Sequence, residues 1–192
     1  MIVVAAAVVG YLVGAVSPAT LIARRRGIDL AAIGSGNPGA SNVGRALGRR
    51  TGIAVALLDV LKGVLPAVAF GLVDHRAGLV AGVAAVLGHV TSPFLRGRGG
   101  KGVATALGAI LGSHPLWAPI VLVVWAVVLG ASRWIALASV LAATSVLVLG
   151  VVFHDDVVWA AALAVVVVAR HQANFVRRLA HPQADPPPTG TG

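Results

Sequence analysis

Three polar stretches interrupt an otherwise apolar chain, and each combines small residues, hydroxyls or amides with cations. They are residues 34–50 (GSGNPGASNVGRALGRR), 89–105 (HVTSPFLRGRGGKGVAT) and 170–178 (RHQANFVRR). Glycine lets successive backbone N–H groups point into one concavity, and such a nest binds anions. Arg45 could add a bidentate grip on phosphate, and Lys101 a point charge. Together the three stretches predict a site for anionic ligands.

Two glycine patterns in these stretches match nucleotide-binding signatures in letters, but their surroundings do not fit. Residues 34–39 read G-x-G-x-x-G, which binds a dinucleotide only between a strand and a helix of a βαβ unit. Here the flanking runs are apolar and long enough for membrane helices. In the second stretch, Leu95 stands where a P-loop needs its first Gly, and Gly102 where it needs Ser or Thr. We therefore expect the glycines to serve a different anion.

His171 is the best candidate for a general acid or base, because imidazole titrates near neutral pH. Asn174 lies three residues on and would share its helix face. His89 is the alternative. Three further histidines fall on the opposite side of the predicted helices, where interfacial roles are expected: His75, His114 and His154. No spacing of His, Asp or Glu suggests a metal site, and no G-x-S-x-G nucleophile elbow is present.

Asp59 and Lys62 are charges inside an apolar run, three residues apart and therefore on one helix face. A charge within a membrane helix is a functional candidate by default. A buried structural pair beside the site is an equally good interpretation, and the sequence leaves both open.

The composition is that of a polytopic membrane protein. Of 192 residues, 58% are hydrophobic and 11% are charged, whereas soluble domains carry about 25% charged residues. A net charge of +9 on so apolar a chain indicates an anionic lipid surface or an anionic substrate before nucleic acid. With no Cys, disulfides, thiolate nucleophiles and Cys-ligated metals are excluded.

The elements that must position the polar stretches are membrane helices, and the fold class we predict is all-α. Apolar segments occur at residues 2–23, 52–73, 77–90, 102–111, 116–131, 134–153 and 157–169. A crossing helix needs about 20 apolar residues, so 102–111 is short for a full span. A re-entrant half-helix there is the alternative to seven crossings.

Charge distribution favours about seven transmembrane helices. Every Lys and Arg except Lys62 and Arg76 then falls on one side, which the positive-inside rule makes the cytoplasm. The N-terminus is therefore expected outside and the C-terminus inside. A re-entrant 102–111 would place the cations of 170–178 outside, against the rule. We expect one transmembrane domain over residues 1–183 and a disordered Pro- and Gly-rich tail at 184–192.

The three stretches also match the signatures of a known family. SGNPGASNVGRALG (35–48) resembles the family pattern S-G-N-x-G-A-T-N-x-x-R-x-L-G. GHVTSPFLRGRGGKGVAT (88–105) and RHQANFVRRL (170–179) resemble the second and third signatures, and DVLKG (59–63) also fits. The resemblance covers most of the chain and is to the bacterial membrane glycerol-3-phosphate acyltransferase (PlsY) family, whose acyl donor is an acyl phosphate.

Five positions depart from the family pattern without removing a phosphate donor. Ser41 replaces a usual Thr, and Arg98 replaces a usual Lys. Ala136 and Ala138 leave Ser139 alone in a stretch that usually reads S-x-S-S, and Gln183 replaces a usual Glu.

The resemblance implies seven transmembrane helices with the signatures on the cytoplasmic face of the bacterial cytoplasmic membrane. It implies transfer of a fatty acyl group from acyl phosphate to the 1-hydroxyl of glycerol 3-phosphate, which gives lysophosphatidate and begins phospholipid biosynthesis. No cofactor and no metal are expected. The expected partners are the two substrates and the lipid bilayer, with the enzyme that makes the acyl phosphate as a candidate and nucleic acid excluded.

Site residues carry over from the signatures. The expected catalytic residues are His171, Lys101 and Ser139. The expected substrate-binding residues are Ser35, Asn37, Ser41, Asn42, Arg45, Gly99, Gly100, Lys101, Gly102, Thr105, His171, Asn174 and Arg177. Ser35, Arg45, Lys101, His171 and Asn174 would hold glycerol 3-phosphate, and the Gly-rich backbone with Thr105 would hold the acyl phosphate.

The mechanism and one rival function stay open at this point. The proton acceptor is either His171 or a substrate phosphate oxygen, and the scarcity of carboxylates favours the phosphate. The rival is a membrane transporter or binder of a phosphorylated solute or anionic lipid, although no internal repeat supports it.

Overall fold

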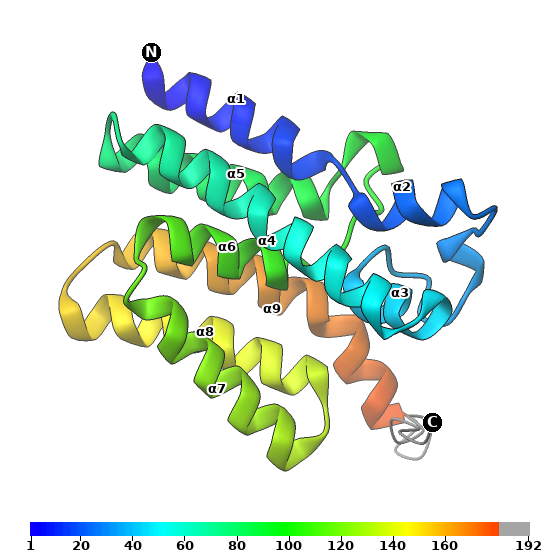
Figure 1. The fold of residues 1–192 in the computed structure, drawn as a ribbon. Coiled ribbons are helices and arrows are strands. Elements are labelled where there is room, and N and C mark those ends of the chain that lie inside the picture. The colour runs from blue at the N-terminus through cyan, green and yellow to red at the C-terminus, as the bar shows by residue number, and fades with distance from the viewer. Residues whose placement is uncertain (181–192) are drawn as a thin grey trace.

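The computed structural model describes residues 1–180, all of whose regular elements are helices. Figure 1 shows them as a bundle of roughly antiparallel rods. The α-helices are α1 (Ile2–Ala15), α2 (Pro18–Arg25), α3 (Ala40–Leu47), α4 (Arg49–Gly71), α5 (His75–Val90), α6 (Val103–Ser113), α7 (Trp117–Ser132), α8 (Ile135–Phe153) and α9 (Val157–Ala180). Two 3-10 turns, η1 (Leu30–Ala32) and η2 (Pro93–Leu95), lie in the connections. Gln183 and the tail at 184–192 lie outside the described residues.

The seven predicted apolar segments all fall on helices, which confirms the all-α fold class. Five are long and apolar enough to cross a membrane: Ile2–Arg25, Arg49–Gly71, His75–Leu95, Ile135–Phe153 and Val157–Ala180. The other two, α6 and α7, have 11 and 16 residues. At 1.5 Å per residue α6 is only about 16 Å long, about half of the ~30 Å hydrocarbon core. The helix α6 therefore cannot span the hydrocarbon core alone, and neighbouring helices must shield its ends from lipid.

Small residues bring these helices into backbone contact. At Gly14 of α1 a Cβ would overlap the carbonyl of Ala85 in α5, and at Gly108 of α6 it would overlap the carbonyl of Val60 in α4. Glycine at such crossings allows the close approach on which helix association in lipid depends. These contacts pack the short helix α6 against α4 and α5, and the two longer helices shield it from lipid.

The first span is broken at Val16-Ser17. Ser17 begins α2 as its N-cap, and its hydroxyl accepts a hydrogen bond from the Thr20 N–H at 3.3 Å. The break leaves the last carbonyls of α1 without partners in their own helix, a costly state in lipid. Ser92 Oγ donates to the Ala15 carbonyl at 2.7 Å, and Lys62 Nζ donates to the Val16 carbonyl at 2.8 Å. Side chains from two other segments therefore satisfy the broken end.

Lys62 also pairs with Asp59, as their spacing predicts. Its Nζ lies 2.8 Å from Asp59 Oδ1, and both side chains are buried. The Nδ1 of His89, at the end of α5, lies 3.5 Å from the same Asp59 oxygen. The pair thus joins α4 to the break in α1 and to the end of α5. Of the two interpretations that the sequence leaves open, these contacts favour the structural one.

The bundle has two chemically different ends. At one end, on the right in Figure 1, lie α2, α3, the connection from α5 to α6 and the C-terminal part of α9. The first polar stretch includes α3, the second lies in the α5–α6 connection, and the third lies on α9. At the other end lie the connections α4–α5, α6–α7 and α8–α9. Because successive helices run in opposite directions, the polar stretches lie at the same end of the bundle, as the charge pattern predicts. Which end faces the cytoplasm stays a prediction.

We expect Lys62→Met to lower the free energy of unfolding by about 3–5 kcal/mol, because it leaves a buried carboxylate without its cation. Denaturant titration in detergent micelles measures the loss. Leu61→Met is the matched control, since Leu61 is 47% exposed on the same helix and should tolerate the change. The double variant Asp59→Leu/Lys62→Met should recover part of the stability. Equal stability of Lys62→Met and the parent chain would contradict a structural pair.

Candidate functional site

The first polar stretch is folded around the side chain of Asn42, which is only 2% exposed. Its Nδ2 donates to the Ile33 carbonyl at 3.0 Å and the Leu30 carbonyl at 3.4 Å. Its Oδ1 accepts the N–H of Ser35 at 3.1 Å. These bonds use both amide donors inside the protein, so Asn42 positions the loop that carries exposed Ser35. The structure thus shows a positioning role for Asn42, and its expected contact with substrate stays a prediction.

The short helix α3 presents Ser41 and Arg45 on an exposed face. The Arg45 guanidinium donates to Ser41 Oγ at 3.0 Å, one helical turn away. Asn37 lies in the turn before α3, and its carbonyl accepts the Gly39 N–H at 2.9 Å. The hydrogen bonds of Ser35, Asn42 and Arg45 lie within residues 30–45.

The second polar stretch enters the protein as a loop held by the end of α5. The N–H of Gly99 donates to the Val90 carbonyl at 3.1 Å, and the N–H of Gly100 to the His89 carbonyl at 3.0 Å. Both glycines are buried. A Cβ at Gly99 would overlap the carbonyls of His89 and Val90, and one at Gly100 would overlap the His89 ring. Only glycine fits these two positions of the loop.

Lys101 follows, half-buried, and Gly102 begins α6 with a φ of +82° in the left-handed region. Glycine adopts this conformation without a Cβ penalty. The turn directs the chain from the loop into α6, so the loop lies directly against the N-terminal turn of that helix. Thr105 lies in this first turn.

Arg170 ties the third polar stretch to the second. Its NH2 donates to the Gly99 carbonyl at 3.0 Å and its Nε to the Gly100 carbonyl at 3.3 Å. The predicted site did not include Arg170. Its only signal in the sequence is its place at the start of the third stretch, and cations there are also expected for lipid contact. The structure makes it a clamp on the backbone of the loop.

His171 lies next to this clamp and is 1% exposed. Its Nδ1 is 2.7 Å from the Val167 carbonyl. A carbonyl oxygen only accepts, so Nδ1 carries the hydrogen, and the neutral ring keeps its lone pair on Nε2. The ring is within electrostatic reach of Lys101 and Arg170. The second and third stretches thus place a guanidinium, an ammonium and a hydrogen-bond acceptor together.

The rest of α9 continues this arrangement for two more turns. Asn174 is half-buried one turn after His171, and Arg177 is exposed a further turn along. Trp134, which precedes α8, packs against Phe175 with ring centroids 4.6 Å apart and lies 5.8 Å from the Arg178 guanidinium. An aromatic contact therefore fixes the end of α9.

Two further expected residues, Thr105 and Ser139, are also buried. Thr105 has no exposed surface, and its Oγ1 has no hydrogen-bond partner within residues 1–180. Ser139 is 1% exposed, and its hydroxyl accepts a hydrogen bond from Trp125 Nε1 at 3.3 Å. That contact joins α7 to α8 and includes no residue of the three stretches. The structure thus gives no contact that supports the expected catalytic role of Ser139.

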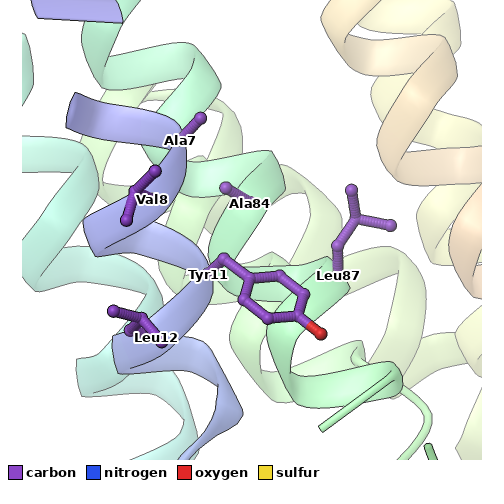
Figure 2. Close-up of a pocket in the computed structure, with 6 residues that line it drawn as sticks. All are labelled: Ala7, Val8, Tyr11, Leu12, Ala84 and Leu87. Carbon is purple, nitrogen blue, oxygen red and sulfur yellow. The ribbon is translucent and has the colours of Figure 1, made fainter. Parts of the chain in front are cut away.

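Figure 2 shows a shallow groove between α1 and α5, lined by Ala7, Val8, Tyr11, Leu12, Ala84 and Leu87. Its lining is apolar except for the Tyr11 hydroxyl, which donates to the Thr91 carbonyl at 3.3 Å. None of the cations described above lines it. The groove is therefore a lipid-facing surface feature and not the anion site.

Comparison with known proteins agrees with the signatures. The family model described as glycerol-3-phosphate acyltransferase matches residues 4–181. The glycerol-3-phosphate acyltransferase of Geobacter sulfurreducens is 42% identical over 177 residues, which cover 89% of this chain and 90% of that protein. The corresponding protein of Aquifex aeolicus is 38% identical over 176 residues, with 88% and 91% covered.

A solved structure has the same fold. The crystal structure of PlsY (YgiH), an integral membrane glycerol 3-phosphate acyltransferase in its glycerol 3-phosphate form, superposes with a TM-score of 0.86. It is 35% identical, and the match covers 93% of this chain and 92% of that one. On the family model, the relatives and this structure together, the chain belongs to the PlsY family of integral membrane glycerol-3-phosphate acyltransferases.

Proposed function

We propose that the chain transfers a fatty acyl group from acyl phosphate to the 1-hydroxyl of sn-glycerol 3-phosphate. The hydroxyl oxygen attacks the acyl carbonyl carbon, the bond from that carbon to the phosphate oxygen breaks, and 1-acyl-glycerol 3-phosphate and phosphate form. The observation that carries the proposal is the clamp of Arg170 on the glycine loop beside Lys101 and His171. These cations can neutralise the phosphate groups of both acyl phosphate and glycerol 3-phosphate when the two substrates are bound side by side. Family membership sets the transporter alternative aside.

The glycine loop is the proposed seat of the acyl phosphate. Gly99 and Gly100 are held from both sides, by carbonyls of α5 and by Arg170. The N–H groups of Gly99 and Gly100 are used in holding the loop, so the donors we propose for the oxyanion that develops at the acyl carbon are those of the first turn of α6, which the loop adjoins. Thr105 lies in the helix turn that follows and keeps its expected place beside the acyl phosphate in this proposal.

Ser35, Arg45, Lys101 and Asn174 are the proposed ligands of glycerol 3-phosphate. Arg45 can bind the phosphate through two parallel N–H donors, and Lys101 neutralises charge. Asn42 acts on this site through Ser35, whose backbone it holds. Asn37, Ser41 and Arg177 complete the proposed rim.

The reaction needs no protein nucleophile, because an acyl phosphate is already activated. Cys is absent, and the Ser139 hydroxyl is bonded to Trp125. Positioning and charge neutralisation supply the rate in this scheme. The Nε2 lone pair of His171 accepts a hydrogen bond from the 1-hydroxyl and orients it, and the departing phosphate takes the proton.

We place the site on the cytoplasmic face of the bacterial cytoplasmic membrane. The basis is the charge distribution, since the end with the polar stretches carries nearly all Lys and Arg. The acyl tail would remain in the bilayer while both phosphates meet at the loop. The enzyme that supplies acyl phosphate would deliver its product to this face.

The donor can be tested directly with purified chain in detergent. Palmitoyl phosphate with labelled glycerol 3-phosphate should yield labelled 1-acyl-glycerol 3-phosphate on thin-layer chromatography, and acyl-CoA should yield none. We expect Arg45→Ala and Lys101→Met to lower kcat/KM by about 100-fold or more, because each removes a charge from the reacting phosphates. Ser139→Ala and the distant Arg76→Ala should keep the parent rate. Product from acyl-CoA alone, or full turnover by Lys101→Met, would contradict the assignment.

Gly100→Ala tests the loop itself. Its added Cβ must displace either the loop or the His89 ring, and a shift of about 1 Å at a reacting group can cost about 100-fold in rate. Gly130→Ala is the matched control, since a Cβ there meets no atom within 4 Å. Kinetics of both variants, each checked for folding by thermal unfolding, give the comparison. A folded Gly100→Ala with the parent kcat/KM would exclude the loop as the donor seat.

The orientation can be read from single cysteines, because the chain has none of its own. Arg76→Cys should react with a membrane-impermeant maleimide on intact spheroplasts. Arg98→Cys should react only after permeabilisation, since the two residues lie at opposite ends of the bundle. The reverse labelling pattern would overturn the proposed sidedness.

A further inference from the structure

The end of the bundle opposite the glycine loop carries a second cluster of ionisable side chains. His75 begins α5, His114 follows α6, and Asp156 precedes α9. The Nε2 of His75 lies 2.6 Å from Asp156 Oδ2, and the Nε2 of His114 lies 3.0 Å from the same oxygen. One potential ligand atom from each of the three residues lies within 4.8 Å of the others. Three connections that are distant in sequence therefore deliver two imidazoles and a carboxylate to one point.

The cluster is separate from the acyltransferase site. His75 and His89 are the first and next-to-last residues of α5, and the rise between them is about 21 Å at 1.5 Å per residue. Nothing in the proposed reaction uses the three side chains. The sequence predicts interfacial roles for both histidines and no metal site, because no short spacing joins the three residues.

His114 is held as a metal ligand would be. Its ring is stacked on Trp117, with centroids 4.1 Å apart and planes 12° apart, and its side chain is 9% exposed. The Nδ1 on the far side of the ring faces Asp155 Oδ2 at 3.8 Å. At 3.8 Å this is an ion-pair distance and too long for a hydrogen bond, but it places a carboxylate on the side of the ring where metal-bound histidines commonly have one.

From this geometry we propose that His75, His114 and Asp156 bind one zinc ion. Two imidazole nitrogens and a carboxylate oxygen are a donor set that zinc takes, with a fourth position left to water. Calcium and magnesium prefer sites made of oxygen alone. The His75 side chain is 58% exposed, so solvent reaches the site and an ion can enter.

The distances require only small adjustments. With bonds of about 2.0–2.1 Å, neighbouring ligand atoms of tetrahedral zinc are about 3.3 Å apart, against 2.6 and 3.0 Å here. Each imidazole nitrogen must withdraw from Asp156 Oδ2 by less than about 1 Å, and the two imidazole nitrogens, which lie within 4.8 Å of each other, must come to about 3.3 Å. Exposed His75 can make both changes by rotation of its side chain. The two histidines and Asp156 would then be joined through zinc and no longer through direct hydrogen bonds, and the ion would link α5, α6 and α9.

Metal analysis of the intact protein tests the proposal. The chain is purified in detergent, freed of any histidine tag and of metal by a chelator, and equilibrated with Zn²⁺ before bound zinc is measured by mass spectrometry. We expect one zinc per chain, and Co²⁺ in its place should give the strong visible absorption of a tetrahedral site. Because zinc binds only the folded chain, the Tm should rise by about 5–10 °C at a free zinc concentration 100 times Kd.

Two variants identify the ligands. His75→Ala removes an exposed side chain, and Asp156→Asn keeps the shape of the third ligand while removing its charge. Each should weaken zinc binding at least tenfold and abolish the shift in Tm. His154→Asn is the matched control, since His154 lies in the same turn outside the cluster and Asn tolerates its φ of +53°. Absence of zinc from the parent chain at micromolar Zn²⁺, or parent-like binding by either variant, would overturn the site.

Discussion

The buried contact of Lys62 with Asp59 is the constraint on which the rest of the structure depends. A membrane helix that stops inside the bundle exposes carbonyls that no water can reach. Here Lys62 binds the carbonyl of Val16, the residue that caps the end of α1, and Asp59 balances the charge that this binding introduces. The same carboxylate faces His89, whose backbone carbonyl holds the N–H of Gly100. A chain of polar contacts therefore leads from the broken first span to the loop proposed to seat the acyl donor.

The proposed site relies on backbone geometry more than on reactive side chains. The loop is fixed by hydrogen bonds to the end of α5 and by the guanidinium of Arg170. Its glycines are required by contact, because any Cβ at Gly99 or Gly100 would enter space that α5 already fills. In the proposed reaction the acyl donor is already activated, so the protein would have only to hold two phosphates and one hydroxyl in place.

The sequence could predict the helices and the residue types of the site, but not how the site is held. Apolar runs and charge asymmetry identify membrane segments without tertiary information, and the signatures identify the family. An amide in a signature can bind either substrate or backbone, and only the fold shows that Asn42 bonds the backbone of Ile33 and Ser35. Arg170 and the His75–His114–Asp156 cluster were missed for the same reason. Their partners are distant in the chain, so no local spacing indicates them.

The break at Val16-Ser17 has an electrical consequence as well as a geometric one. Where α1 ends, its aligned peptide dipoles sum to a negative partial charge of about half an elementary charge. The Lys62 ammonium lies against that helix end, at 2.8 Å from the Val16 carbonyl. The cation is thus shared between the Asp59 carboxylate and a helix end, while His89 lies 3.5 Å from the same carboxylate. The balance of charge around Lys62 and Asp59 therefore depends on where α1 ends.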